Sequence, residues 1–140
     1  MSEMRDSGLV EPIDKDECLS LLQRKAKVGR VGFVEGTKPM ILPVNYFSDG
    51  ESIVFCTSDG GTLSGLENGT EVAFEIDGSA SLEHSGWSVV AHGQVRHVTE
   101  EEELSEFRRS TLQSWGRGSP EYWILIEIDA ISGRRIPATY

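Results

Sequence analysis

MILPVNYFSDGESIVFCTSDGGTL, residues Met40–Leu63, is the stretch of sequence that decides the fold. Its two apolar segments, Met40–Phe47 and Ser52–Thr57, flank the residues SDGE, which predicts a β-hairpin closed by a glycine-containing turn. The second strand then runs into threonine, serine and glycine residues. Their hydroxyls and open backbone N–H groups suit a bound phosphate, although a plain surface loop explains the same composition.

Pro43 lies in the middle of the first strand of this hairpin. Proline cannot donate a hydrogen bond to a neighbouring strand, so Pro43 is predicted at a sheet edge or a bulge. The backbone groups of Val44 and Asn45 are then free to bind a ligand. The Asn45 amide can both donate and accept hydrogen bonds, and a buried, satisfied amide is the alternative to a binding role.

The residues before the hairpin predict an arm, a helix and a strand. Met1–Pro12 mixes charged residues with serine and glycine, which indicates a flexible arm. Asp14 and Glu17 have the spacing of a capping box, so a helix is expected to begin there and to end near Gly29. Val28–Val34 is β-branched and spaced by glycines, as is typical of a strand that bends tightly.

Three later segments alternate apolar and polar residues and are therefore predicted strands. They are Thr70–Asp77, Trp87–Val98 and Tyr122–Asp129. In Trp87–Val98 one face is expected to be apolar and the other mainly polar. With the hairpin and Val28–Val34 this makes six strands.

The segments between these strands are predicted to be less regular. Gly78–Gly86 is expected to form a polar loop. Thr99 and the acidic residues that follow it predict the start of a helix, because carboxylates are favoured at the positive end of a helix. Ile131–Ile136 is a basic, glycine-bearing tail without an evident packing role.

Six strands without regular strand–helix alternation favour a mainly β (α+β) fold, an antiparallel barrel with peripheral helices. The chain of 140 residues is long enough for one ordinary domain, which we place at residues 13–140 after an N-terminal arm of residues 1–12.

The composition excludes several classes of partner. Thirteen Lys and Arg residues stand against 23 Asp and Glu residues, and the net charge of −10 repels nucleic acid and anionic membranes. This charge also disfavours an oligonucleotide-binding barrel of the same size. Cys18 and Cys56 lack the close spacing of a zinc or redox pair. With no apolar signal peptide or membrane span, we expect a cytoplasmic protein.

Recognisable catalytic and metal-binding motifs are missing from the sequence. His84, His92 and His97 occur without the spacing of metal ligands, so no metal site is expected. The motifs of serine hydrolases, P-loop nucleotidases and Rossmann dinucleotide sites are also missing. Glu75 and Asp77 share a strand face, but in so acidic a chain we interpret them as solvated. No catalytic residue is predicted.

The segments GRVGFV, PMILPVNYFSDGESIVFCTSDGGTL, VAFEID, GWSVVAHGQV and SGRRI occur in this order from Gly29 onward. Together they resemble the flavin-binding split-barrel family typified by pyridoxamine 5′-phosphate oxidase, and more closely its short FMN-binding branch. The resemblance implies a homodimer of six-stranded antiparallel split β-barrels, with flavin mononucleotide in two grooves between the subunits. It implies the following contacts: Val44 and Asn45 at the isoalloxazine edge, Thr57, Ser58 and Thr62 around the phosphate, Trp87 and Ser88 from the second subunit, and Arg134.

The chain departs from the family at Thr62, where a lysine is common. No basic residue occurs between Lys38 and Arg96. Loss of a charge-assisted contact to the phosphate costs about 1.5–3 kcal/mol. The compensating charge must then come from elsewhere, and the arginines considered for this are Arg30, Arg96, Arg134 and Arg135.

Two functions follow from the resemblance and this departure. The first is a flavin-dependent oxidoreductase acting on a small-molecule redox substrate, with deazaflavin or haem as alternative cofactors. The second is a cofactor-poor or cofactor-free split-barrel dimer that acts as a binding or interaction protein.

Overall fold

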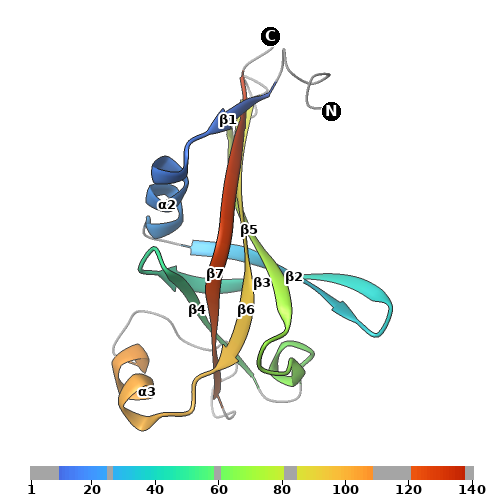
Figure 1. Cartoon of the computed structure of the whole chain (residues 1–140), viewed down its shortest axis with the longest axis vertical. Coiled ribbons are helices and arrows are strands. Elements are labelled where there is room, and N and C mark those ends of the chain that lie inside the picture. The colour runs from blue at the N-terminus through green and yellow to red at the C-terminus, as the bar shows by residue number, and fades with distance from the viewer. Residues whose placement is uncertain (1–9, 25–26, 59–60, 81–84, 109–120, 138–140) are drawn as a thin grey trace.

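In the residues that the structure describes, long antiparallel strands predominate, with two helices beside them (Figure 1). The computed structural model describes residues 10–24, 27–58, 61–80, 85–108 and 121–137. The elements are β1 (Glu11–Ile13), α2 (Lys15–Gln23), β2 (Lys27–Glu35), β3 (Lys38–Ser48), β4 (Ser52–Ser58), the 3₁₀ turn η1 (Leu63–Gly65), β5 (Glu71–Ala80), β6 (Ser85–His97), α3 (Glu101–Arg108) and β7 (Glu121–Ile136).

Six of the strands close into a ring. The strand order is β1-β7-β4-β3-β2-β5-β6, and an additional pairing of β6 with β7 joins the two sides. β7, the longest strand with 16 residues, pairs with β1, β4 and β6 and runs along the long axis of the molecule (Figure 1). The predicted mainly β fold, a six-stranded antiparallel barrel with peripheral helices, is confirmed. β1 is a seventh strand outside the ring.

In the ring, β3 and β4 form backbone pairs over only part of their length. β3 pairs with β2 over most of its length, from Lys38 to Tyr46, but with β4 only over Tyr46–Ser48. The part of β3 before Tyr46 therefore has a free edge on its β4 side within the described sheet. Pro43 lies on this part, as its missing N–H predicts. The opening between β3 and β4 is the split of the barrel.

The core confirms the predicted strand faces. Alternate residues of β5 and β6 point inward, and each is at most 5 % exposed. A smaller cluster lies between the β4–β7 pair and α3, where Leu104 and Phe107 of the helix pack on it. The inward residues of β5 and β6 are Val72, Phe74, Ile76, Val89, Ala91 and Val95, and those of the smaller cluster are Val54, Cys56, Val98, Trp123 and Leu125.

The first helix begins as predicted but ends earlier. The Asp14 carboxylate accepts a hydrogen bond from the Glu17 backbone N–H at 2.8 Å, which caps α2. The helix ends at Gln23, and the prediction that it reaches Gly29 is wrong. Gly29 lies inside β2, where the ring of Phe74 occupies the space that a Cβ would fill. This glycine therefore reflects close packing, not the end of a helix.

The predictions for the least hydrophobic strand segments are also corrected. β5 continues to Ala80 and β6 begins at Ser85, so most of the expected loop Gly78–Gly86 is strand. Ile131–Ile136 is the second half of β7 and pairs with β6 and β1. Glu11 and Pro12, expected in the arm, belong to β1; residues 1–9 are outside the described residues. Backbone hydrogen bonds continue the strands into these segments, although apolar and polar side chains no longer alternate there.

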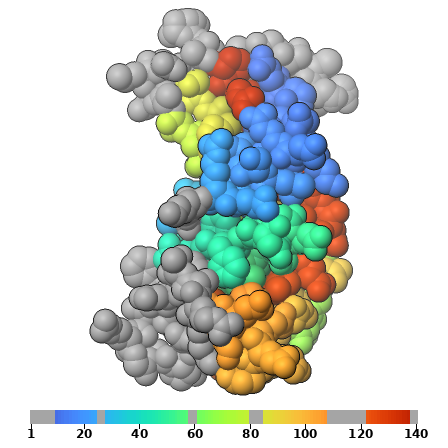
Figure 2. Space-filling model, turned by 90° about the vertical axis from the view of Figure 1, so that its left-hand side faces the viewer, coloured from blue at the N-terminus to red at the C-terminus, as the bar shows by residue number. Residues whose placement is uncertain are grey.

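The two helices lie on the same side of the barrel. Figure 2 shows α2, the β3–β4 region and α3 one after another along this side. The Tyr46 hydroxyl donates to the Leu22 carbonyl oxygen at 3.0 Å and ties α2 to β3. In the part of the chain that the structure describes, no helix is long and apolar enough to cross a membrane.

Candidate functional site

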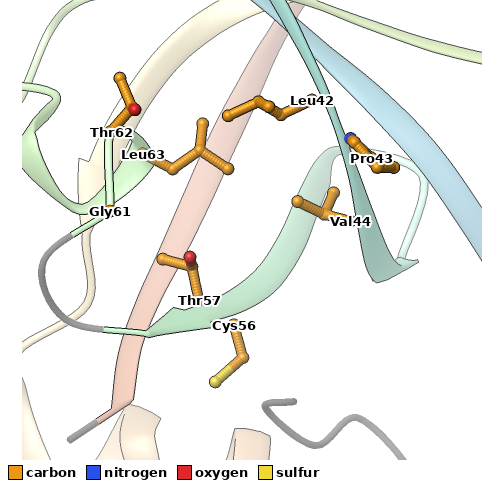
Figure 3. A pocket seen from close by; sticks show the side chains of 8 residues that line it. All are labelled: Leu42, Pro43, Val44, Cys56, Thr57, Gly61, Thr62 and Leu63. Atoms are coloured by element: carbon orange, nitrogen blue, oxygen red, sulfur yellow. The ribbon is translucent and has the colours of Figure 1, made fainter. Parts of the chain in front are cut away.

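A first hollow lies at the split of the barrel (Figure 3). Its volume is about 200 Å³. We call it the threonine pocket. It is lined by Leu42, Pro43 and Val44 of β3, Cys56 and Thr57 of β4, and Gly61, Thr62 and Leu63 of the segment that follows β4.

The threonine pocket combines an apolar wall with two hydroxyls. Leu42 and Leu63 point toward one another, and the Cys56 side chain points away from them (Figure 3). Leu63 is only 4 % exposed and anchors the turn η1, in which the Gly65 N–H donates to the Thr62 carbonyl oxygen at 3.2 Å. None of the residues that line the threonine pocket carries a charge. The pocket therefore offers hydroxyl donors and apolar contact without a cation.

The structure brings together three of the five residues that were predicted at this end of the flavin. Val44, Thr57 and Thr62 line the threonine pocket. Asn45 is not among the lining residues; it follows the buried Val44 on β3 and is itself half-buried. Ser58 ends β4 opposite Glu121. The Ser58 side chain and residues 59–60 of the predicted phosphate loop are outside the described residues.

A second hollow contains the other predicted residues. Trp87, Ser88 and Arg134 line it together, because Ser88 pairs with Arg134 in the β6–β7 ladder. Its volume is about 340 Å³, and we call it the tryptophan pocket. Its lining residues are Glu75, Asp77, Gly78, Ser79, Ser85, Gly86, Trp87, Ser88, Arg134 and Ile136.

A glycine makes room for the indole of Trp87. Gly78 lies opposite Trp87 in the β5–β6 ladder. A Cβ on Gly78 would lie 2.6 Å from the indole Nε1, closer than such atoms approach in proteins. The indole is half-buried and also packs against the barrel core. The position of Trp87 therefore depends on a residue without a side chain at position 78.

The two pockets lie at opposite ends of β7. Thr57 of the threonine pocket pairs with Tyr122, near the beginning of β7, and Arg134 of the tryptophan pocket is near its end. At about 3.3 Å per residue, roughly 40 Å of strand separates these two positions. β7 runs along the long axis without turning back (Figure 1). One small ligand cannot contact both pockets of the same chain.

Arg134 is the exposed cation of the tryptophan pocket. Among the described residues it makes no ion pair. The other three arginines that were considered as a source of positive charge are held by carboxylates: Arg30 by Glu75 at 3.1 Å, Arg96 by Glu103 at 3.1 Å, and Arg135 by Glu17 at 2.8 Å.

Two carboxyl groups on β5, interpreted from the sequence as merely solvated, line a pocket. Glu75 and Asp77 line the tryptophan pocket, and Arg30 Nη1 lies 3.1 Å from Glu75 Oε1 and 3.4 Å from Asp77 Oδ2. Burial, the hydrogen bond to Asp77 and the charge of Asp77 raise the pKa of Glu75 to about 7, against the opposing effect of Arg30. The sequence signal for this pair was its spacing, because residues two apart on a strand lie side by side on the same face.

No metal centre is formed by the described part of the chain. Nowhere in residues 10–24, 27–58, 61–80, 85–108 and 121–137 do three His, Cys, Asp or Glu side chains gather in a way that could hold a metal ion. His84 is outside the described residues. The Nε2 atom of His97 lies 2.5 Å from the Leu66 carbonyl oxygen, and the His97 backbone N–H donates to Asn68 Oδ1 at 2.8 Å. His97 thus connects β6 to the segment after η1.

Comparison with known proteins gives concordant matches. The family model described as pyridoxamine 5′-phosphate oxidase matches residues 14–135. An uncharacterised protein of Mycobacterium tuberculosis is 31 % identical over an alignment of 134 residues, and the match covers 92 % of this chain and 87 % of that protein. The FAD-binding protein of Mycobacterium smegmatis superposes with a TM-score of 0.79 at 29 % identity, over 92 % of this chain and 100 % of that one. The FAD- and haem-binding protein of the same organism shares the fold at 15 % identity, with a TM-score of 0.66 over 94 % and 74 % of the two chains.

Proposed function

The chain belongs to the pyridoxamine 5′-phosphate oxidase family, and we propose that it binds flavin mononucleotide in two grooves, each formed between two copies of the chain. The observation that carries this proposal is the separation of the two pockets. One chain presents two half-sites with roughly 40 Å of strand between them. A two-fold dimer unites the threonine pocket of one copy with the tryptophan pocket of the other, and does so twice.

The two half-sites are chemically complementary. The threonine pocket supplies the hydroxyls of Thr57 and Thr62 for a phosphate and the apolar wall at Val44 for the ring, but no cation. The partner subunit's Arg134 supplies the positive charge that Thr62 lacks, and the partner's Trp87 supplies an aromatic surface. Charge-assisted hydrogen bonds to phosphate are the strong ones, so this arginine replaces the lysine that is common in the family.

The residues that line the two pockets are suited to bind a flavin, and we assign none of them a catalytic role. A bound flavin supplies redox chemistry, so we infer a flavin-dependent oxidoreductase that acts on a small-molecule redox substrate. The chain binds the phosphate, positions the ring at the free edge of β3 and excludes water from one of its faces. The net charge of −10 disfavours nucleic-acid and anionic-membrane partners. A cytoplasmic location is part of the proposal.

The absorbance spectrum of the purified protein tests the proposal. We expect the bands of a bound flavin, or quenching of flavin fluorescence when FMN is added. Chromatography of the released cofactor then distinguishes FMN from FAD, from a deazaflavin and from haem, which share parts of this chemistry. A protein that is colourless as purified and leaves FMN fluorescence unchanged contradicts the proposal.

A second candidate function is a split-barrel dimer that has lost its cofactor and acts as an interaction protein. Thr62 and the uncharged lining of the threonine pocket favour it, because a phosphate finds no cation among the residues that line this pocket. The dimeric mass is expected in both cases. A dimer that binds neither flavin nor haem supports this second function over the first.

A further inference from the structure

The two carboxyl groups of the tryptophan pocket face the place where the proposed function puts an anion. Glu75 and Asp77 lie on the outward face of β5, and Asp77 pairs with Ser88 across the β5–β6 ladder. Ser88 in turn pairs with Arg134 on β7. The carboxyl pair and the exposed Arg134 are thus two strands apart on one surface, in the wall of one hollow.

The cluster that Glu75 and Asp77 form with Arg30 carries a net negative charge when both carboxyl groups are ionised, because Arg134 makes no ion pair with either of them. Arg30 Nη1 serves both of them, at 3.1 Å and 3.4 Å, so one guanidinium faces two negative charges. The Glu75 side chain is only 29 % exposed, and water therefore screens this excess poorly. One proton on the carboxyl pair makes this cluster neutral, and the raised pKa of Glu75 indicates that Glu75 takes it up first.

We propose that an anionic ligand in the tryptophan pocket is bound together with one proton, which the Glu75–Asp77 pair holds. This inference rests on the proposed function, because it takes the flavin phosphate as the anion near Arg134. A negative charge that enters the pocket repels the ionised pair and favours the protonated pair. By linkage, the affinity for the anion must fall as the pair loses its proton. The pKa of Glu75, raised to about 7, places this change near neutral pH.

The other groups near Glu75 define the controls. Arg30 faces it from β2, Asp77 from its own strand, and Arg134 from β7. His92 lies on the same face of β6, opposite Ala73. Glu71 is on the same strand but exposed and outside the pocket, with its carboxylate 3.5 Å from the Gln94 amide. Glu71→Gln is therefore the matched control for Glu75→Gln. His92→Gln tests whether His92, and not the carboxyl pair, causes a pH dependence.

The experiment is a titration of the full-length dimer with FMN between pH 7 and pH 9. A phosphate monoester, with a second pKa of about 6, is doubly charged throughout this range. A tenfold preference of the anion for the protonated pair predicts about fivefold weaker binding at pH 9 than at pH 7. Glu75→Gln is expected to bind FMN independently of pH, while Glu71→Gln and His92→Gln keep the wild-type dependence. Riboflavin, which has no phosphate, is expected to show no dependence.

Calorimetry of the wild-type protein provides a second test that needs no variant. Binding enthalpies measured in two buffers with different ionisation enthalpies give the number of protons taken up. We expect uptake of about half a proton per FMN at pH 7.5. FMN binding with no proton uptake and no pH dependence overturns the inference and leaves the proposed function intact. A riboflavin affinity that falls in the same way as that of FMN also overturns it. A protein that binds no FMN at any pH refutes the proposed function itself.

Discussion

Thr62 stands where the resemblance to the family implies a lysine. Its hydroxyl lines the threonine pocket together with that of Thr57, and none of the lining residues carries a charge. The sequence alone was enough to find both threonines, because hydroxyls and glycines after a strand are typical of phosphate loops. It could not show that Arg134 is exposed and that three other arginines are held by carboxylates.

Adding a positive charge at position 62 is expected to strengthen flavin binding. Thr62→Lys places an ammonium group in a pocket that has no cation, and a charge-assisted contact with the phosphate contributes about 1.5–3 kcal/mol, or about ten- to a hundredfold in affinity. Quenching of FMN fluorescence measures the change. Gln94→Lys adds the same charge outside both pockets and is expected to leave affinity nearly unchanged. Equal gains in both variants would instead reveal a general effect of net charge.

Gly78 controls the position of the Trp87 indole. In Gly78→Ala the new methyl group collides with the indole 2.6 Å away, so Trp87 must move. We expect a changed tryptophan fluorescence spectrum, weaker flavin binding and a stability loss of about 1–3 kcal/mol. Gly65→Ala is the control, because no atom lies within 4 Å of a Cβ at that position. An unchanged spectrum in Gly78→Ala contradicts this account of the indole.

At the scale of elements, the hydrophobic pattern predicts the strands where one face is buried and fails where both faces are polar. Alternation identified Thr70–Asp77 and Trp87–Val98, whose inward residues form the core. It missed the second half of β7 and the ends of the β5–β6 hairpin, because there the backbone ladder, not side-chain burial, holds the strands together. The tryptophan pocket lies beside these segments. The sequence therefore singled out residues that line the two pockets, but not the full length of the strands that carry Ser88 and Arg134.

The closure of the barrel depends on Gly93 in β6. The β6–β7 register shifts between His92 and Gly93, and the Glu127 carbonyl oxygen occupies the space of a Cβ at Gly93. Gly93→Ala must push the two strands apart, and we expect a stability loss of about 3 kcal/mol or more in chemical denaturation. Gly32→Ala, also within a strand, meets no atom closer than 3.8 Å and is expected to cost far less. Similar losses in both variants would point to strand propensity instead.

At the scale of the whole molecule, the Glu75 carboxyl makes stability depend on pH. Its pKa is raised from 4.5 to about 7 in the folded chain. A group with a raised folded pKa stabilises the fold fully below its unfolded pKa, and this contribution is lost as the pH rises through the folded pKa. The wild-type protein is therefore expected to lose stability between about pH 5 and pH 8 relative to Glu75→Gln. Denaturant midpoints of both proteins across this range measure the difference, and parallel curves contradict the prediction.

The arrangement of the two pockets also predicts the behaviour of mixed dimers. Thr62→Glu places a negative charge in the threonine pocket, and Arg134→Glu does the same in the tryptophan pocket. Each variant alone is expected to bind no FMN, because both grooves of its dimer contain one defective half. In a mixed dimer one groove contains both defects and the other contains none.

Random exchange of subunits between the two variants makes half of the dimers mixed, so about one quarter of all grooves regain FMN binding if the partner subunit completes each site. FMN stoichiometry measured after co-refolding of equal amounts tests this, and light scattering confirms that the species is a dimer. A site contained within one chain stays defective in every mixture. Every chain in the mixture carries one of the two substitutions, so only a groove formed between two different chains can be free of both. Recovery of about one quarter of the FMN sites therefore identifies the shared site directly.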